Sequence, residues 1–365
     1  MTYTSHDVQG FDYVHHYVGN ARHTAFFYAA QYGFDIVGYQ GPETGVKDQV
    51  SYMLNQNDLT FIVTAPLDPN HPKQKFIRTH GDGVGEITLK VPSPAAAVDF
   101  ASRNGAEVLD PVKTVTDEHG SFISGSIAIY GGVKLTFINR EDYNEILIPG
   151  YNHYEGPQFK IRQPGLQYVD HIVGNVGEGE MDKWAAFFED CLDFETYIHF
   201  DKGDISTQYS SLVSKVVRSK NSAVKFPINE PAEGIKKSQI EEFLDEYHGA
   251  GVQHVAIATN DILGTIQNLT DRGVQFIPIP QTYYDVVADR VAIMKEDLET
   301  VKRLNILIDR EGDGYLLQLF TQPINDRPTL FFEFIQRHGS EGFGQNNFQS
   351  LFESIEQEQA KRGNL

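Results

Sequence analysis

Cysteine is almost missing from this sequence, which contains Cys191 alone among its 365 residues. A single cysteine excludes an intramolecular disulfide and favours a cytoplasmic protein, because disulfides are uncommon where thiols are kept reduced. The first residues show no basic segment followed by an apolar stretch, so no secretory signal is expected. Apolar runs also stay well short of the ~20 residues that a membrane-spanning helix needs, and we expect no membrane partner.

Basic residues are scarce as well, with 30 Lys and Arg against 50 Asp and Glu and a formal net charge of −20. Proteins that bind nucleic acid normally carry a basic excess or a basic cluster, so nucleic acid is not an expected partner. An anionic substrate would need local positive charge, which a bound metal ion can supply. The apolar fraction of 40% is ordinary for a globular chain that buries more than one core.

What the chain does contain is internal similarity. Residues 13–20 (YVHHYVGN) match residues 168–175 (YVDHIVGN) at six of eight positions. Residues 81–84 (GDGV) match 249–252 (GAGV), and residues 137–140 (FINR) match 334–337 (FIQR). Each copy shows the pattern of a strand, a helix and further strands, with helix starts at Ser93 and Asp261 and stops at Gly105 and Gly273. The pattern predicts a duplicated α+β fold in two halves, each of two such units.

Two further segments differ from the repeats in composition: the one between the two halves and the one at the end of the chain. Residues 141–166 contain three Pro/Gly pairs and are predicted to be a linker between domains at 1–140 and 167–365. Near the end, residues 342–344 (GFG) form a flexible joint, and Asn347 is placed to cap a terminal helix. One face of that helix is apolar, with a spacing of three and four residues: Phe348, Leu351, Phe352 and Ile355.

Three side chains of the second half form a candidate metal site: His171, His254 and Glu333. Glu333 stands in the apolar run 330–335 (LFFEFI), where an unpaired carboxylate would be costly to bury and a cation would offset that cost. An outward-facing strand residue is the alternative for Glu333 taken alone, since strands alternate their faces. Two imidazoles and one carboxylate form the facial triad of non-haem Fe(II) enzymes, although Zn²⁺ accepts the same ligands.

The repeat assigns first-half counterparts to these three residues. It places His16 opposite His171, Glu86 opposite His254 and Thr136 opposite Glu333. Only the first of these positions keeps its residue type, so we expect no metal site in residues 1–140.

Several ordered motifs of the second half resemble the 4-hydroxyphenylpyruvate dioxygenases of the vicinal oxygen chelate superfamily. The resemblance covers nearly the whole chain and is strongest from about Gln167 onward. Its motifs are 169–171 (VDH), 226–231 (FPINEP), 237–240 (KSQI), 251–254 (GVQH), 309–320 (DREGDGYLLQLF), 327–333 (RPTLFFE) and 342–344 (GFG). It implies two vicinal-oxygen-chelate domains, each an open mixed β-barrel of two βαβββ units, followed by a C-terminal helix that acts as a lid.

The resemblance implies one Fe(II) per chain bound by His171, His254 and Glu333, with no catalytic residue beyond these ligands. On residue type alone, a surface amide would be the simpler interpretation of Asn229 and Gln239. Family members usually have a glycine where this chain has Asn346, a residue that tolerates left-handed backbone better than most. The implied substrate-binding residues are Ser214, Asn229, Gln239, Gln253, Gln318, Phe320, Phe331, Phe343 and Phe348.

The implied reaction consumes 4-hydroxyphenylpyruvate and O₂ and yields homogentisate and CO₂, as in tyrosine and phenylalanine catabolism. It combines oxidative decarboxylation, ring hydroxylation and side-chain migration. A homo-oligomer, either a dimer or a tetramer, is expected. The nearest alternative is 4-hydroxymandelate synthase, which uses the same ligands and substrate. A metal-dependent isomerase or lyase of the same superfamily would not consume oxygen, and a non-catalytic binding module would not need the intact triad.

Overall fold

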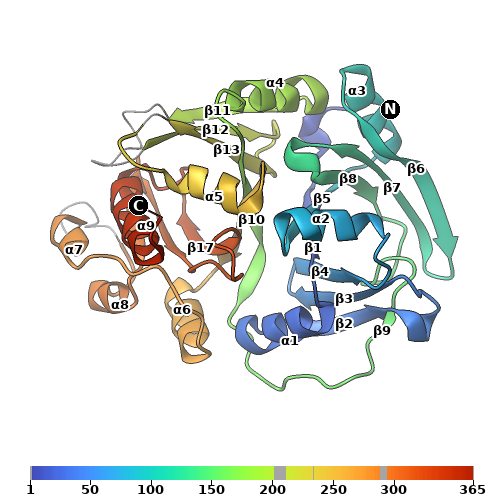
Figure 1. Ribbon diagram of the computed structural model, residues 1–365, viewed down its shortest axis with the longest axis horizontal. Coiled ribbons are helices and arrows are strands. Elements are labelled where there is room, and N and C mark those ends of the chain that lie inside the picture. The colour runs from blue at the N-terminus through green and yellow to red at the C-terminus, as the bar shows by residue number, and fades with distance from the viewer. Residues whose placement is uncertain (1, 201–210, 233, 288–293, 365) are drawn as a thin grey trace.

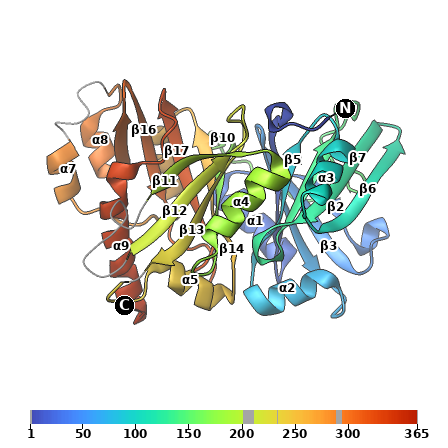
Figure 2. The same cartoon turned by 90° about the horizontal axis from the view of Figure 1, so that it is seen from above.

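The protein is described from a computed structural model that covers residues 2–200, 211–232, 234–287 and 294–364. Within this part of the chain the strands form two curled sheets, one from each half, which stand side by side with helices on their outer surfaces (Figure 1). The predicted α+β architecture is therefore confirmed. Helices α3 (Pro94–Arg103) and α4 (Met181–Leu192), one from each half, contact each other across the boundary (Figure 2).

The N-terminal sheet has the strand order β6-β7-β8-β5-β1-β4-β3-β2-β9. Its strands are β1 (Gly10–Tyr17), β2 (Asp35–Gln40), β3 (Gln49–Gln56), β4 (Leu59–Pro66), β5 (Gly83–Lys90), β6 (Val108–Asp117), β7 (Gly120–Ala128), β8 (Lys134–Asn139) and β9 (Asn152–His153). The last of these belongs to the segment 141–166 and pairs with β2.

The C-terminal sheet has the order β11-β12-β13-β10-β14-β17-β16-β15. Its strands are β10 (Leu166–Asn175), β11 (Glu195–Phe200), β12 (Ser211–Arg218), β13 (Lys225–Ala232), β14 (Gly251–Thr259), β15 (Leu307–Glu311), β16 (Gly314–Phe320) and β17 (Phe331–His338). The helices of the molecule are α1 (Ala21–Tyr32), α2 (Pro72–His80), α3 (Pro94–Arg103), α4 (Met181–Leu192), α5 (Gln239–Tyr247), α6 (Ile262–Asp271), α7 (Thr282–Val287), α8 (Leu298–Arg303) and α9 (Phe348–Arg362).

Both sheets are built on the same plan. In the N-terminal sheet β1 and β5 pair antiparallel at the centre, while β1 pairs parallel with β4 and β5 pairs parallel with β8. In the C-terminal sheet β10 and β14 take the central place, with β13 and β17 as their parallel neighbours. Each half thus consists of two βαβββ units joined through their first strands.

At most of the predicted positions, the helices begin at a capping side chain or are followed by a glycine. The side chains of Ser93 and Asp261 accept hydrogen bonds from the first turns of α3 and α6. Gly105 and Gly273 follow these helices with positive φ angles of 102° and 85°, a conformation that glycine adopts without strain. Asn347 precedes α9, but its side chain does not cap the helix, because its Oδ1 instead accepts a hydrogen bond from the buried Tyr283 hydroxyl.

An aromatic cluster joins the two halves into one core. The ring of Phe332 in β17 packs against Tyr28 and Tyr32 of α1 and against Phe61 of β4, with centroid distances of 5.3 to 5.9 Å. Strand alternation turns Phe332 toward this interface and its neighbour Glu333 to the opposite face of β17. The apolar run around Glu333 thus stabilises the contact between the halves, while the carboxylate faces the inside of the C-terminal sheet.

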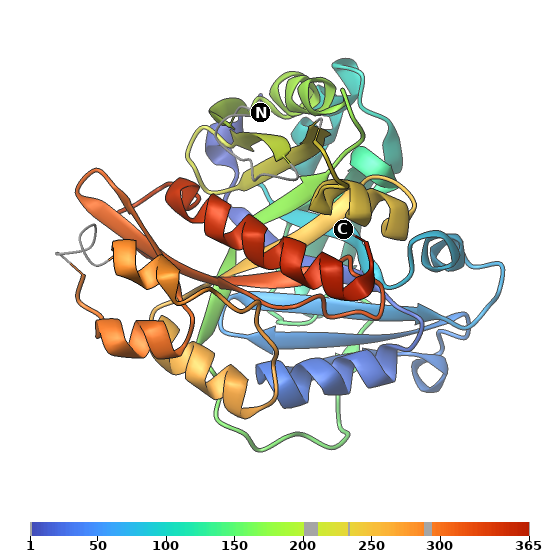
Figure 3. The ribbon, with the colours of Figure 1, turned by 60° about the vertical axis from the view of Figure 1, so that its left-hand side comes forward.

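Helix α9 crosses the open side of the C-terminal sheet (Figure 3). Its Phe352 packs into a small apolar cluster with Phe200, Leu212 and Ile240. At its far end Arg362 donates two hydrogen bonds to the carboxylate of Glu242 in α5, at 3.1 and 2.7 Å. Among the described helices, none combines the length and apolar character that crossing a membrane requires.

Candidate metal centre and substrate cavity

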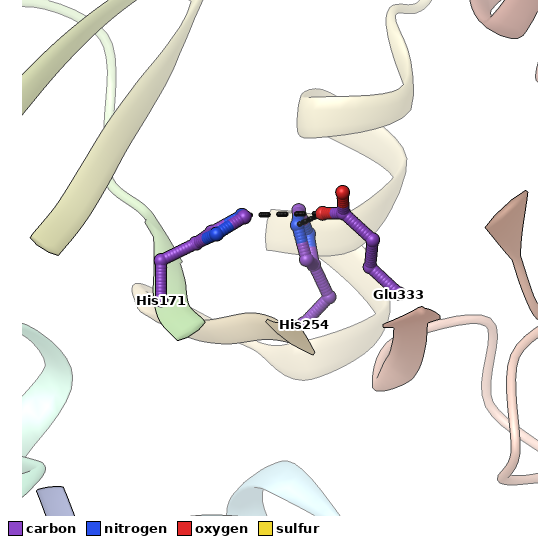
Figure 4. A group of neighbouring side chains, drawn as sticks. All are labelled: His171, His254 and Glu333. Atoms are coloured by element: carbon purple, nitrogen blue, oxygen red, sulfur yellow. Dashed lines mark ion pairs between the residues drawn. The ribbon is translucent and has the colours of Figure 1, made fainter. Parts of the chain in front are cut away.

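Three strands of the C-terminal sheet bring His171, His254 and Glu333 together (Figure 4). These residues come from β10, β14 and β17, and all three side chains are buried. Nε2 of His171 lies 3.1 Å from Oε2 of Glu333, and Nε2 of His254 lies 3.3 Å from the same oxygen. The three potential ligand atoms lie within 4.8 Å of one another.

Both imidazoles are oriented by hydrogen bonds at their other nitrogen. Nδ1 of His171 lies 2.8 Å from Oδ1 of Asp170, and Nδ1 of His254 lies 2.9 Å from Oε1 of Gln253. An oxygen at Nδ1 holds the proton there and leaves the Nε2 lone pair directed toward the centre, which is how ligating histidines are normally supported. Gln253, expected at the substrate, therefore also contacts a candidate ligand.

Burial and mutual charge set the protonation of the three side chains. Burial acts to raise the pKa of Glu333, but the charge and hydrogen bonds of His171 and His254 outweigh it and lower that pKa to about 2. Burial likewise acts to lower the pKa of His171, but Glu333 and Asp170 outweigh it and raise that pKa. The pKa of His254 is lowered, chiefly by burial. The carboxylate is thus ionised and held by imidazoles, as a cation site requires.

The donor set fits a transition-metal ion. Two ligands at right angles, each about 2.1 Å from one ion, lie about 3 Å apart, which matches the 3.1 and 3.3 Å separations of the imidazole nitrogens from Glu333. Three protein donors on one side leave the remaining coordination positions open. His171, His254 and Glu333 would hold the ion. Among the described residues, these three form the group of His, Cys, Asp or Glu side chains close enough together to share one metal ion.

Arg337 links the candidate ligand His171 to the start of the C-terminal segment. Its guanidinium donates to both carboxylate oxygens of Asp170 at 2.8 Å and to the carbonyl oxygen of Gly342 at 2.6 Å. The guanidinium also lies 5.6 Å from the ring of Phe343, which packs against His171 at 5.0 Å. Burial acts to raise the pKa of Asp170, but Arg337 and His171 hold it well below its usual range. These contacts connect the ligand to the joint that precedes α9.

A cavity of about 80 Å³ opens onto the three side chains. Most of its lining is apolar and aromatic, with a few amides and a hydroxyl, the composition of a site for an aromatic ligand with polar ends. Eight of the nine expected substrate residues line this cavity: Ser214, Asn229, Gln239, Gln253, Phe320, Phe331, Phe343 and Phe348.

Gln318 is the ninth expected substrate residue, and it lies apart from this lining. It is fully buried in β16, and both polar atoms of its amide lack a hydrogen-bond partner among the described residues. Gly344 sits directly over this amide with a φ of 78°, and a Cβ at that position would come within 2.4 Å of Nε2 of Gln318. The joint before α9 therefore favours glycine for its backbone conformation, and a larger residue there would also have to displace the Gln318 amide.

Several apolar lining residues were not predicted as substrate contacts: Val173, Phe200, Leu212, Val216, Pro227, Leu351, Phe352 and Ile355. Two sequence signals point to some of them. The apolar face predicted for the terminal helix contains Leu351, Phe352 and Ile355. Alternation along β12 places Leu212, Ser214 and Val216 on one face.

The strand register corrects one expectation from the repeat. His254 pairs with Val173, and Glu86, its counterpart, pairs with His15. This register makes Tyr13, three residues before His16, the counterpart of His171. His16 itself packs against Tyr28 and Phe61 in the core between the halves, so the equivalence of His16 and His171 was wrong. The expectations for Glu86 and Thr136 agree with the register.

Asn346 also differs from expectation. It belongs to a short 3-10 helix, Gln345–Asn347, and it is not among the residues with a positive φ. Its side-chain amide donates a hydrogen bond to Asp309 at 2.6 Å. A side chain that ties this turn to β15 therefore occupies the position, and its tolerance of left-handed backbone is not used.

Known proteins share both the sequence and the fold of this chain. The family model of the Glyoxalase/Bleomycin resistance protein/Dioxygenase superfamily matches residues 168–318. A triple mutant of 4-hydroxymandelate synthase from Streptomyces coelicolor superimposes with a TM-score of 0.86 at 28% identity, covering 97% of this chain and 99% of that one. A xylose isomerase-like TIM barrel/4-hydroxyphenylpyruvate dioxygenase fusion protein shares the fold, with a TM-score of 0.73 at 21% identity over 96% of this chain and 52% of its own.

Similarity to curated sequences is higher still. A 4-hydroxyphenylpyruvate dioxygenase from Aspergillus fumigatus is 43% identical, covering 98% of this chain and 94% of that protein. One from Dictyostelium discoideum is 41% identical, covering 98% of this chain and all of its own length. With similarity that extends across both halves, the chain belongs to the 4-hydroxyphenylpyruvate dioxygenase family of oxidoreductases.

Proposed function

We propose that this chain binds one Fe(II) through His171, His254 and Glu333 and converts 4-hydroxyphenylpyruvate and O₂ into homogentisate and CO₂. The observation that carries the proposal is a buried set of two imidazoles and one carboxylate that opens onto an aromatic cavity. A bound Fe(II) supplies redox chemistry with O₂ at the coordination positions that the three side chains leave open. Family membership favours Fe(II) over Zn²⁺, which accepts the same ligands.

In this proposal the polar lining residues orient the substrate. Asn229 and Gln239 provide amides that can both donate and accept hydrogen bonds, and Ser214 provides a hydroxyl. Such neutral groups hold a phenol and a keto acid without competing for the metal. Nδ2 of Asn229 lies 3.2 Å from Oδ1 of Asn175, which restrains the amide before substrate arrives.

The aromatic residues are proposed to hold the substrate ring and to exclude water. Phe331 stacks on the imidazole of His254 with ring centroids 4.8 Å apart, and Phe343 packs against His171. Phe348 and the apolar face of α9 complete the wall of the cavity on the side that would otherwise meet solvent. A closed wall limits side reactions of reactive intermediates with water.

Oxygen uptake tests this proposal directly. Purified protein with Fe(II) and 4-hydroxyphenylpyruvate should consume O₂, release CO₂ and form homogentisate, identified by chromatography and mass spectrometry. Oxygen uptake should fail in a His254→Ala variant that remains folded. A wild-type protein that converts 4-hydroxyphenylpyruvate without consuming O₂ would contradict the proposal and favour an isomerase or lyase of the same superfamily.

The second candidate is 4-hydroxymandelate synthase, favoured by the structural similarity to that enzyme. It uses the same substrate and would also consume O₂, so product identity separates the two. Hydroxymandelate as the main product would replace the first proposal.

Residues 167–365 are proposed as the catalytic domain, 1–140 as a domain without a metal site, and 141–166 as the linker. The buried free thiol of Cys191 is compatible with the expected cytoplasmic location. A homo-oligomeric state is expected and can be measured by light scattering.

A further inference from the structure

The N-terminal sheet has a cavity at the place that the substrate cavity occupies in the C-terminal sheet. Thr64 and Asn229 hold equivalent positions, because Tyr17 pairs with Thr64 and Gly83 just as Asn175 pairs with Asn229 and Gly251. The same registers relate other positions of the two sheets, some of which line the cavities: Ser51 to Ser214, Lys134 to Phe331, Ser124 to Gln318, and Tyr13, Glu86 and Thr136 to the candidate metal ligands.

This N-terminal cavity measures about 220 Å³, larger than the 80 Å³ cavity at the candidate metal centre. Its floor carries a buried hydrogen-bonded network instead of a ligand triad. Both oxygens of Glu86 are engaged, with Nδ1 of His15 at 2.9 Å and the hydroxyl of Thr136 at 2.6 Å. Burial lowers the pKa of His15 to about 4, so this imidazole is neutral near pH 7. The floor is therefore satisfied by itself and needs no metal ion.

The groups that remain unpaired around the cavity are mainly hydrogen-bond donors. Lys113 has no carboxylate partner, and the hydroxyls of Tyr13 and Ser124 make no hydrogen bond, as far as the described residues extend. Lys134 contacts Asp110 at 2.8 Å and Glu86 at 3.4 Å, which leaves one ammonium hydrogen unused. Against these donors stands one carboxylate oxygen at the rim, Oδ1 of Asp110, which has no hydrogen-bond partner among the described residues.

The charges around the cavity leave one ammonium group, that of Lys113, without a carboxylate contact among the described residues. Lys113 and Lys134 line the cavity, and Lys73 donates to the lining residue Gln49 at 3.0 Å. Glu86 and Asp110 at the cavity and Asp48 beside Lys73 balance these three charges. Within the described residues, Lys113 is the lining ammonium group that contacts no carboxylate, so its charge is available to a ligand. Apolar side chains complete the walls: Val115, Phe122, Ile148 and Pro149.

We propose that this N-terminal cavity is a second small-molecule binding site, which takes an organic carboxylate with an apolar or aromatic body. Lys113 and the free hydrogen of Lys134 bind the carboxylate, since charge-assisted hydrogen bonds are the strong ones. Tyr13 and Ser124 supply further donors, and the wall formed by Val115, Phe122, Ile148 and Pro149 covers the apolar body. The site needs neither the candidate metal centre nor the proposed reaction.

Methyl NMR of the full-length protein tests the proposal with phenylacetate as the probe. The methyl groups of Val115 and Ile148 report on the N-terminal cavity, and those of Leu351 and Ile355 report on the substrate cavity. Phenylacetate should shift the Val115 and Ile148 resonances saturably. Phenylacetamide has nearly the same shape without the charge and should bind the N-terminal cavity roughly tenfold more weakly.

Lys113→Gln should also weaken phenylacetate binding at Val115 and Ile148 by roughly tenfold. Lys113 is exposed, so its replacement should leave the fold intact. Lys183→Gln, at a lysine with 67% side-chain exposure on α4, is the matched control and should bind as wild type does. The proposal is overturned if phenylacetate leaves Val115 and Ile148 unshifted, if phenylacetamide binds equally well, or if Lys113→Gln has no effect.

Discussion

Asp170 accepts hydrogen bonds from two residues at once, His171 on one side and Arg337 on the other, with its Oδ1 2.8 Å from Nδ1 of His171 and 2.8 Å from Nη2 of Arg337. This carboxylate fixes the orientation of a candidate metal ligand and is itself fixed by an arginine from β17. Asp170→Asn should therefore weaken Fe(II) binding by roughly 10- to 100-fold, the usual effect of removing such a partner. Metal titration of the purified variant measures the change.

The N-terminal half offers a matched control for this substitution. Asp12 and Arg140 hold the equivalent positions, with Oδ2 of Asp12 3.5 Å from Nη1 of Arg140. Asp12→Asn removes the corresponding ion pair where no candidate ligand depends on it. Both variants should lose stability, but Asp12→Asn should keep wild-type metal affinity. Equal loss of metal in the two variants would show that Asp170 acts through the fold alone.

The three candidate ligands should be needed for metal binding individually. His171→Ala, His254→Ala and Glu333→Ala should each abolish turnover and lower the iron content of the purified protein. Iron affinity should also fall as the pH is lowered, because the ligands bind in their deprotonated forms and the pKa of His171 is raised. Full activity in any of these variants would remove that residue from the ligand set.

His16 should behave as a core residue. Its ring lies 4.8 Å from that of Phe61, and burial lowers its pKa to about 3, so it is neutral near pH 7. His16→Ala should reduce the free energy of unfolding by about 2 to 4 kcal/mol, as other large-to-small core substitutions do, and should leave iron content unchanged. Denaturant unfolding and metal analysis of the same preparation test both parts. Loss of iron from a folded variant would contradict the strand register.

Helix α9 should keep oxygen consumption coupled to product formation. A chain that ends after Gly342 lacks the aromatic wall and should consume O₂ without matching homogentisate, or lose activity, while His171 and the other ligands remain. Phe343→Ala should produce a milder uncoupling, measured with an oxygen electrode and product chromatography. Phe159→Ala, at a ring that is 39% exposed outside the cavity, should stay coupled. A truncated protein that melts normally and stays tightly coupled would show that α9 is not a lid.

The pair His15 and Glu86 should make the N-terminal half sensitive to acid. Burial lowers the pKa of His15 from 6.5 to about 4. Burial acts to raise the pKa of Glu86, but its hydrogen bond with His15 and the charge of Lys134 outweigh it and lower that pKa from 4.5 to about 2. In both cases the unfolded chain takes up protons first, so stability declines as pH falls, from about 6.5 to 4 for His15 and from about 4.5 to 2 for Glu86.

A Glu86→Gln variant isolates the second part of this effect. The difference in melting temperature between wild type and Glu86→Gln should be largest near pH 7 and should shrink as the pH falls below about 4.5. A difference that stays constant from pH 7 to pH 3.5 would show that Glu86 is not ionised in the way its surroundings indicate.

Local sequence patterns predicted much of this molecule. Repeated motifs indicated two related α+β halves, and helix-capping residues such as Ser93 and Asp261 marked helix starts. An acidic residue between two phenylalanines singled out Glu333, and the spacing of Phe348 to Ile355 indicated the apolar face of α9. These features depend on residues close together in the chain, where backbone geometry dictates which side chains share a face.

The comparison of matching motifs predicted the wrong counterpart for His171, because it did not include the strand register. Residues 13–20 resemble 168–175, yet the pairing of β1 with β5 and of β10 with β14 makes Tyr13, not His16, the counterpart of His171. A shift by an odd number of residues turns a side chain to the opposite face, which is why His16 lies in the core. Register depends on hydrogen bonds to β5 and β14, which a comparison of short segments does not contain.

Short-range patterns therefore predicted the duplicated fold and singled out three candidate ligands, and the family resemblance implied most of the aromatic cavity wall. The surroundings of these residues follow from the folded sheets: the two hydrogen bonds of Arg337 to Asp170, the burial of Gln318 beneath Gly344, and the charged cavity of the N-terminal sheet. These features join residues that stand far apart in the chain. Their partners are selected by packing of the folded sheets, since neither spacing nor residue type specifies which distant side chains meet.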